Sequence, residues 1–160
     1  MALTVSIGEI YQAAPVLSKI SQAKLSVIGA MKLSQVMSVV DTHIDEFEAE
    51  RQAKLKELAV LKEDGSISYH EDVDAQGKPA NKADFPTPEA EKAMEDYGNE
   101  LLKRGRRIPF RIKAKHLAPP FGGTNGGYAL TVHECRMLGR FLSYDDLPAE
   151  LDETLEEGEL

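Results

Sequence analysis

Cysteine and tryptophan are scarce or missing in this chain of 160 residues, which contains one cysteine and no tryptophan. The single Cys135 excludes an internal disulfide framework and a zinc site built from several cysteines. Aromatic residues make up only 6% of the chain, whereas hydrophobic residues make up 42%. A core of this composition is aliphatic, and it favours helix-on-helix packing over a β-sandwich or barrel.

Long apolar stretches are lacking as well. No run approaches the roughly 20 residues that a membrane-spanning helix requires. The chain begins MALTVSIGEIYQ, without the basic region and apolar run of a secretory signal peptide. We therefore expect a soluble protein that is not secreted, has no membrane contact and folds in a reducing compartment. The net charge of −8 argues against general binding to nucleic acid.

Sequence signatures of catalysis and metal binding are also missing. The histidines at positions 43, 70, 116 and 133 show neither an HExxH motif nor paired spacing. The glycine-rich stretch PPFGGTNGGY lacks the Lys-Ser/Thr ending of a phosphate-binding loop. Cys135, near His133 and Asp145, falls on the apolar side of its expected helix, which favours a structural thiol over a nucleophile. The sequence thus predicts no catalytic residue, metal site or cofactor, and no enzyme.

The feature that organises the chain is an apolar seam between Ala30 and Leu61, with residues spaced alternately by three and four. Glycine and proline are absent from this run, and charges fill its other faces. The pattern predicts one long helix, roughly 48 Å in length, that lies along a partner helix. Arg51 and Lys54 interrupt the seam, which favours a contact with another subunit there; an exposed seam is the alternative. The predicted contact residues of this helix seam are Met37, Val40, Ile44, Phe47, Arg51, Lys54, Leu58 and Leu61.

Capping signals mark the helices at the beginning of the chain. Ser6 and Glu9 match a capping box, and the helix that they open should kink or divide at Pro15. Ser26 is the expected N-cap of the long helix. That helix should end near residue 62, because Asp64-Gly65 is a strong turn signal.

Two further helices are expected. Thr87 and Pro88 have the N-cap and first-turn positions of one that packs back on the long helix, and Gly105 ends it. Thr131 and Glu134 form a second capping box before a short closing helix. The buried stripe of the first of these helices is predicted to be Ala90, Met94, Tyr97 and Leu101.

Two short segments alternate polar and apolar residues and are expected to be strands. They are Ser66 to Tyr69 and Ile108 to Lys115, which we expect to pair with one another, or the second with another subunit. Residues 70–84 (HEDVDAQGKPANKAD) contain almost no apolar side chains, so a flexible or partner-ordered loop is predicted there.

Charges of opposite sign gather in two segments. The stretch 103–115 holds seven of the chain's 19 basic residues and no acid, and we name it the basic segment. The acidic tail, 143–160, holds eight acids and no base. An acidic protein partner, including another part of this protein, is the favoured interpretation of the basic segment; solvated charge and nucleic acid are the alternatives. The basic residues are Lys103, Arg104, Arg106, Arg107, Arg111, Lys113 and Lys115, and the acidic ones are Asp145, Asp146, Glu150, Asp152, Glu153, Glu156, Glu157 and Glu159.

The order of these features resembles that of small, uncharacterised helical proteins encoded by tailed bacteriophages. The similarity lies in Lys24-Leu25-Ser26, Phe47-Glu48-Ala49-Glu50-Arg51, Glu63-Asp64-Gly65 and Leu130-Thr131-Val132-His133-Glu134. The proline-rich stretch 78–88 and the acidic tail depart from that outline. The resemblance implies a phage-encoded protein, in the virion or the host cytoplasm, with no catalytic residues to carry over.

Taken together, the sequence predicts a mainly α fold with a long antiparallel helical hairpin and a minor two-stranded β element. We expect one domain over residues 1–142, followed by the acidic tail. The favoured function is a non-enzymatic structural or assembly protein of a bacteriophage, an oligomer that acts through contacts with itself or other virion proteins. The alternatives are a phage inhibitor or regulator that binds a basic host protein and, with less support, a nucleic-acid-binding accessory protein.

Overall fold

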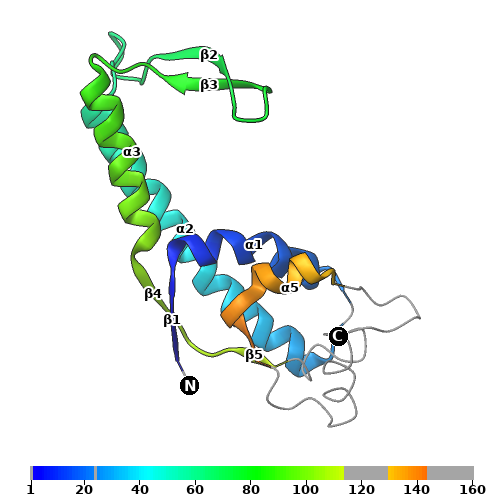
Figure 1. The fold of residues 1–160 in the computed structure, drawn as a ribbon. Helices are drawn as coiled ribbons and strands as arrows, with labels where there is room; N and C mark the ends of the chain where they lie inside the picture. Colours follow the sequence, from blue (N-terminus) through cyan, green and yellow to red (C-terminus); the bar gives the residue numbers. More distant parts are fainter. Residues whose placement is uncertain (1, 24, 114–129, 144–160) are drawn as a thin grey trace, which may run out of the picture. The chain divides into compact units, whose positions relative to one another are not determined.

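The computed structural model describes residues 2–23, 25–113 and 130–143 of the chain (Figure 1). The fold is mainly α, with a long antiparallel helical hairpin of α2 (Val27–Leu58) and α3 (Pro88–Lys103) and small two-stranded sheets, as predicted. Contacts divide the chain into two compact units. Unit 1 comprises Met1–Ile44 and Gly105–Leu160, and unit 2 comprises Asp45–Arg104.

Helix α1 (Ile7–Ser21) is the first helix of unit 1 and begins with the predicted capping box. The Ser6 hydroxyl accepts a hydrogen bond from the backbone N–H of Glu9, whose carboxylate accepts from the N–H of Ser6. The expectation that the helix divides at Pro15 is wrong, because α1 continues through this exposed residue. An interior proline costs about 3 kcal/mol, and burial of the opposite face offsets that cost. The buried residues of that face are Ile7, Ile10, Ala13, Val16, Leu17 and Ile20.

Helix α2 begins where the sequence predicts and ends slightly earlier. The Ser26 hydroxyl accepts from the N–H of Gly29 at 3.1 Å, which confirms Ser26 as the N-cap. The helix stops at Leu58 rather than near residue 62. The turn at Asp64-Gly65 is confirmed, since Gly65 has a φ of 82° and the Asp64 carboxylate accepts from the N–H of Ser66.

The strands of unit 1 pair over long sequence distances. Strand β1 (Leu3–Ser6) is antiparallel to β4 (Gly105–Ile108), and β5 (Ile112–Lys113) is parallel to β6 (Leu142–Ser143). The predicted mate of the 108–115 segment, Ser66 to Tyr69, is therefore wrong. Leu3, Val5 and Ile108 are all buried, so pairing with β1 places apolar residues of both strands in one core.

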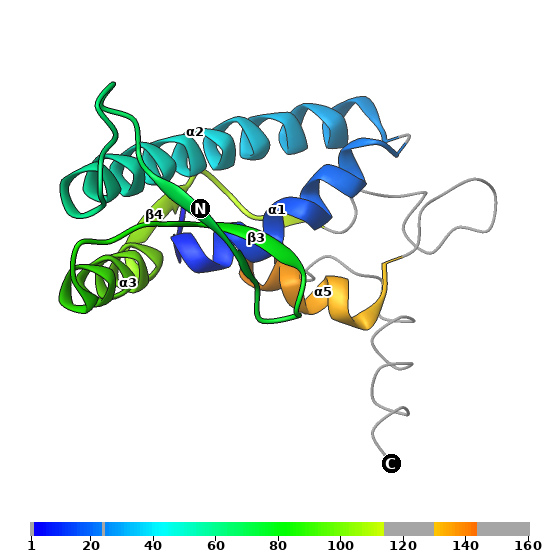
Figure 2. The same cartoon turned by 90° about the horizontal axis from the view of Figure 1, so that it is seen from above.

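Unit 1 is completed by α5 (Val132–Leu138) and the short 3₁₀-helix η1 (Gly139–Phe141). The predicted capping box of Thr131 and Glu134 is present at the start of α5. Helix α5 packs against α1, as both ribbon views show (Figures 1 and 2). Leu138, Phe141 and Leu142 are buried and add to the aliphatic core that α1 presents.

Residues 70–84 of unit 2 form most of a β-hairpin, so the prediction of a loop there is wrong. Strand β2 (Tyr69–Val73) pairs with β3 (Pro79–Ala83) in antiparallel register. The connecting turn is built by Asp74, whose carboxylate accepts from the N–H groups of Gln76 and Lys78. Gly77 adopts a φ of 77°, which favours glycine. Turn chemistry and backbone pairing thus order a segment that has little apolar content.

Helix α3 has the start that the sequence predicts. The Thr87 hydroxyl accepts from the N–H of Ala90, and Pro88 is the first helical residue. Met94 and Leu101 of the expected stripe are buried, whereas Ala90 and Tyr97 are half-buried. Gly105 does not cap the helix, since Arg104 has that position. It is part of β4, where an added Cβ would meet the Thr4 side chain at 3.0 Å.

Candidate functional site

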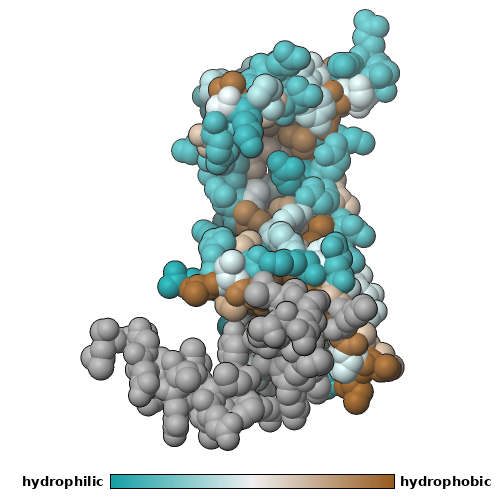
Figure 3. Space-filling view, turned by 90° about the vertical axis from the view of Figure 1, so that its right-hand side faces the viewer, coloured by the Kyte–Doolittle hydropathy of each residue, from teal (hydrophilic) through white to brown (hydrophobic). Residues whose placement is uncertain are grey.

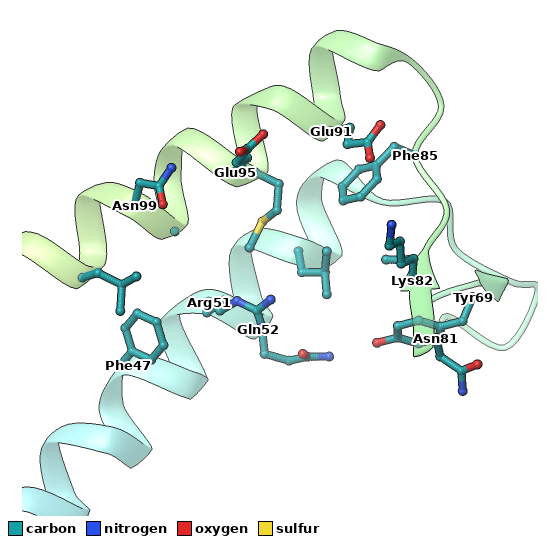
Figure 4. A pocket seen from close by; sticks show the side chains of 15 residues that line it. Phe47, Arg51, Gln52, Tyr69, Asn81, Lys82, Phe85, Glu91, Glu95 and Asn99 are labelled. Carbon is teal, nitrogen blue, oxygen red and sulfur yellow. The ribbon is translucent and has the colours of Figure 1, made fainter. Parts of the chain in front are cut away.

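Unit 2 contains an open groove of about 600 Å³ between α2, α3 and the β2–β3 hairpin (Figure 4). We name it the hairpin groove. Side chains from all three elements line it. Helix α2 contributes Phe47, Arg51 and Leu55, helix α3 contributes Glu95, Gly98 and Leu102, and the hairpin and its exit contribute Tyr69, Lys82 and Phe85.

The floor of the hairpin groove is apolar. Leu55 and Met94 belong to a buried cluster with Ala59 and Ile67, and Phe85 packs against it. Phe47 is also buried and adds an aromatic ring to the lining. An open groove with such a floor can bury apolar side chains of a partner.

The rim of the groove carries charges of both signs. Arg51 is exposed on α2, Lys82 on β3, and Glu91 and Glu95 on α3 (Figure 4). The Lys82 ammonium lies 2.9 Å from Asp72, and that hydrogen bond raises the pKa of Lys82. An apolar centre with a mixed polar rim is the anatomy of a protein–protein contact surface.

The structure divides the predicted helix seam between buried and accessible positions. Val40 and Phe47 are buried, whereas Arg51 and Leu61 are exposed, and Leu61 lies beyond the end of α2. Lys54 bonds Glu57 at 2.8 Å and lies 5.6 Å from the centre of the Tyr97 ring. Its pKa is raised, chiefly by the Glu57 hydrogen bond. Half-buried positions are Met37, Ile44, Lys54 and Leu58.

Part of this seam is buried, and part lines the hairpin groove. Phe47 and Arg51 line the groove, so two predicted contact residues belong to the candidate site. Their contact with a partner stays a prediction. Sequence patterns did not reveal Tyr69, Lys82 or Phe85, because these residues join the groove only through the hairpin.

The described residues of the predicted basic segment lie on elements of both units. Lys103 ends α3, and Arg104 bonds Glu50 at 2.7 Å within unit 2. Arg106 and Arg107 belong to β4 of unit 1, and the Arg107 carbonyl lies 3.1 Å from Nε2 of His43. Arg111 is exposed and Lys113 half-buried, while Lys115 and residues 144–160 lie outside the described part of the chain.

Unit 1 has an opening of its own, about 440 Å³ in volume, which we name the basic cavity. Lys32, Arg111 and Lys113 line it together with Phe110. The Lys32 ammonium lies 5.5 Å from the centre of the Phe110 ring, a cation–π distance. Lys32 was not part of the predicted basic segment, since it comes from α2 and joins the cavity through folding. The remaining lining residues are Ala2, Leu3 and Ser143.

A Ser–Asp–His arrangement beside the hairpin does not have the order that nucleophilic catalysis needs. Asp84 accepts from the Ser68 hydroxyl and also contacts Nδ1 of His70, so the carboxylate is the central group. A nucleophile requires a direct bond to the base, with the carboxylate behind it. The Ser68 bond, followed by the His70 bond, lowers the pKa of Asp84. This arrangement joins the residue that follows β3, Asp84, to Ser68, which precedes β2, and to His70 of β2.

Within residues 2–23, 25–113 and 130–143, no group of three or more His, Cys, Asp or Glu side chains has the geometry to hold a metal ion. None of the helices in that described part has the length and apolar character needed to cross a membrane. Cys135 is half-buried on α5.

Comparison with known proteins gives no further assignment: no family model, curated protein or solved structure matches this chain.

Proposed function

We propose that this chain is a non-enzymatic structural or assembly protein, and that subunits contact one another through the hairpin groove. The observation that carries the proposal is the apolar floor that Leu55, Met94 and Phe85 form in an open groove. A cavity of about 600 Å³ accommodates several aliphatic side chains. The rim carries charges of both signs, which can orient a protein partner. Such a rim does not favour a polyanion over a polycation.

The favoured occupant is a second copy of the same chain. Three apolar residues at the start of α2, Val27, Ile28 and Met31, are 77%, 62% and 61% exposed. Their spacing places Val27 and Met31 on one side of the helix, one turn apart, with Ile28 beside them. We name them the α2 start patch. The chain thus presents an exposed apolar patch and an apolar groove that can receive the patch of another copy. This supports self-association by heterologous contacts.

Most of the visible surface is unsuited to such a contact. Figure 3 shows one face on which hydrophilic side chains prevail and hydrophobic ones occur in small groups. The chain's net charge of −8 also keeps copies apart unless a specific surface joins them. Specific association therefore needs an apolar surface of the kind that the hairpin groove and the α2 start patch provide.

The setting that we propose is a bacteriophage particle or its assembly in the host cytoplasm. Its support is the resemblance in feature order that the sequence shows, from Lys24-Leu25-Ser26 to the segment around Thr131.

Light scattering after size exclusion tests the proposal on the full chain. We expect a defined oligomer for the unaltered protein and a shift toward monomer for the double variant Ile28→Ser/Met31→Ser. Val132→Ser is the matched control, because Val132 is an exposed apolar residue of unit 1 outside the patch. A monomer at all concentrations contradicts self-assembly. Stoichiometric capture of a basic host protein by that monomer would support the inhibitor alternative instead.

A further inference from the structure

Strand β2 is paired along one of its two edges. At one end of the hairpin the Asp74 N–H donates to the Lys78 carbonyl, and at the other end the Asp84 N–H donates to the Ser68 carbonyl, both at 2.8 Å. The register between these two bonds is unbroken. Because an antiparallel strand bonds its neighbour at every second residue, the backbone groups of the even-numbered residues of β2 face β3, and those of the odd-numbered residues face away.

The edge that faces away from β3 presents the backbone N–H and C=O groups of Tyr69, Glu71 and Val73. We name it the β2 open edge. In the part of the chain that the structure describes, β3 is the only strand that shares a sheet with β2. The Ser68 N–H donates to the Val60 carbonyl, but Ser68 is an even-numbered residue, so this contact lies on the β3 side.

The side chains of the β2 open edge also favour association. Tyr69 and Val73 are 48% and 55% exposed, and they lie on the same face of the strand because they are four positions apart. Figure 1 shows that the hairpin projects from the helices of unit 2. An exposed strand edge with apolar side chains is a template on which another strand can form hydrogen bonds.

We propose that β2 pairs with β2 of a second copy of this chain, in antiparallel orientation, so that two hairpins form one four-stranded sheet. A register centred on Glu71 is the one that pairs all five residues of the strand. It places Tyr69 opposite Val73 of the second copy, and His70 opposite Asp72 of the second copy. Apolar side chains thus meet each other, and a side chain that can carry positive charge meets a carboxylate. Because the pairing is symmetric, each contact occurs twice, and this self-complementarity identifies the partner.

Two features limit the strength of the pairing. Glu71 meets Glu71 of the second copy, and like charges directly opposite one another repel. The Val73 N–H already donates to the Asp72 carboxylate at 2.7 Å, so it must exchange that acceptor for a carbonyl of the second copy. The dimer should therefore be reversible, depend on protein concentration, and be weakened by the charge of Glu71.

The pairing is separate from the contact proposed for the hairpin groove. Strand β3 contributes three consecutive residues, 81–83, to that groove, whereas β2 contributes Tyr69. Neighbouring residues of a strand point to opposite faces, so three consecutive lining residues place the groove beside the outer edge of β3. The β2 open edge is the other edge of the hairpin, and its pairing leaves the β3 edge accessible.

Disulfide formation tests the partner and the register together, in a Cys135→Ser background of the full chain. Residues that face each other as a hydrogen-bonded pair have Cα atoms about 5.5 Å apart, a distance that a disulfide spans. Under mild oxidation, Glu71→Cys should form a linked dimer about tenfold faster than Asn81→Cys, the matched position on β3. Val73→Cys should also be slow, because four residues of offset place the two thiols roughly 13 Å apart along the strand. Equal rates for the three variants would overturn the inference.

The charge of Glu71 provides a second measurement. Light scattering follows dimerisation in a dilution series of the Ile28→Ser/Met31→Ser variant, in which the α2 start patch is lost. Adding Glu71→Gln should lower the dissociation constant of the remaining dimer about threefold, because the central repulsion disappears. Glu63→Gln, which neutralises an exposed acid outside the strand, is the control and should leave the constant unchanged. Equal constants for the two variants, or monomers throughout, would overturn the inference.

The same series separates this inference from the groove contact. If the unaltered chain assembles and the patch substitutions leave only monomers, the groove contact stands and the strand pairing is wrong. If the unaltered chain forms dimers that the patch substitutions do not change, and Glu71→Gln strengthens them, the strand pairing stands and the groove contact is wrong.

Discussion

Arg140 and Glu9 form a two-pronged ion pair between residues 131 positions apart in the sequence. Nε and Nη2 of Arg140 donate to the two carboxylate oxygens of Glu9 at 2.9 and 2.7 Å. Glu9 also accepts from the backbone N–H of Ser6 at the start of α1. One carboxylate therefore caps a helix and joins that helix to η1.

This pair predicts a specific dependence of stability on pH. The Arg140 hydrogen bond, foremost, lowers the pKa of Glu9 from 4.5 to about 2. Because the folded-state pKa is the lower one, the stabilisation is present above pH 4.5 and is lost as the pH falls toward 2. Both side chains are substantially exposed, so we expect about 1 kcal/mol rather than the full linkage value.

Denaturant unfolding of Arg140→Gln at several pH values checks this dependence. The variant should be less stable at pH 7 and should lose less stability between pH 4.5 and 2 than the unaltered chain. Some dependence of the unfolding free energy on pH should remain, because the hydrogen bond from Lys19 lowers the pKa of Glu134 as well. Arg136→Gln, which changes another exposed arginine of α5, is the control and should keep the full slope. An unchanged slope in Arg140→Gln would contradict the role of the pair.

Gly98 offers a test of the hairpin groove that does not weaken the fold. It lies inside α3, lines the groove, and has no atom within 4 Å of an added Cβ. Gly98→Ala should raise the free energy of unfolding by about 0.5–1 kcal/mol, since glycine is unfavourable in helices. Gly98→Leu should fill the groove and shift the oligomer toward monomer in light scattering. Gly98→Ala should preserve assembly, and equal oligomer sizes for both variants would argue against the groove as the contact surface.

Gly77 predicts the opposite outcome for the same substitution. Its φ of 77° lies in the left-handed region, so Gly77→Ala should destabilise the β2–β3 turn by about 1 kcal/mol. Hydrogen exchange of the hairpin amides should become faster, and exchange of the α1 amides should not change. Equal protection of the hairpin in both proteins would show that the turn conformation does not limit its stability.

Phe141 is the largest of the fully buried side chains in the described part of unit 1, with 2% of its surface exposed. Phe141→Ala should lower the free energy of unfolding by about 3–5 kcal/mol, through lost burial and the cavity left behind. Thermal unfolding followed by circular dichroism measures the loss. Val132→Ala, which shortens an exposed apolar side chain of α5, should change stability by less than about 0.5 kcal/mol. Comparable losses for both variants would contradict the assigned core.

Local signals in the sequence predicted the helices well. The hydroxyls of Ser6, Ser26, Thr87 and Thr131 all cap helices as their spacing indicates. These interactions involve neighbouring residues, so a single sequence contains nearly all the necessary information. Pro15 misled the prediction because its cost is local, whereas the burial that outweighs it depends on α5 and the β1–β4 sheet.

Strand pairing and the site were harder to predict for the same reason. The mate of β4 is β1, about a hundred residues away in the sequence, and composition gives no clue to that partner. Residues 70–84 looked like a loop because hydrogen bonds, not apolar burial, hold the β2–β3 hairpin. The seam pattern found Phe47 and Arg51 in the groove, but it could not find Lys82 or Phe85, which depend on that hairpin.

Unit 1 is built from two separate stretches of the chain, which the antiparallel pairing of β1 with β4 joins. This has a consequence for how the chain can change over evolution. Unit 1 is discontinuous: it is left after Ile44 and entered again at Gly105. On either side of that gap, Nε2 of His43 lies 3.1 Å from the carbonyl of Arg107. Unit 2 thus has the topology of an inserted module whose two attachment points are neighbours in the host. Such an insertion can lengthen, shorten or be exchanged for another module while the host keeps its own core.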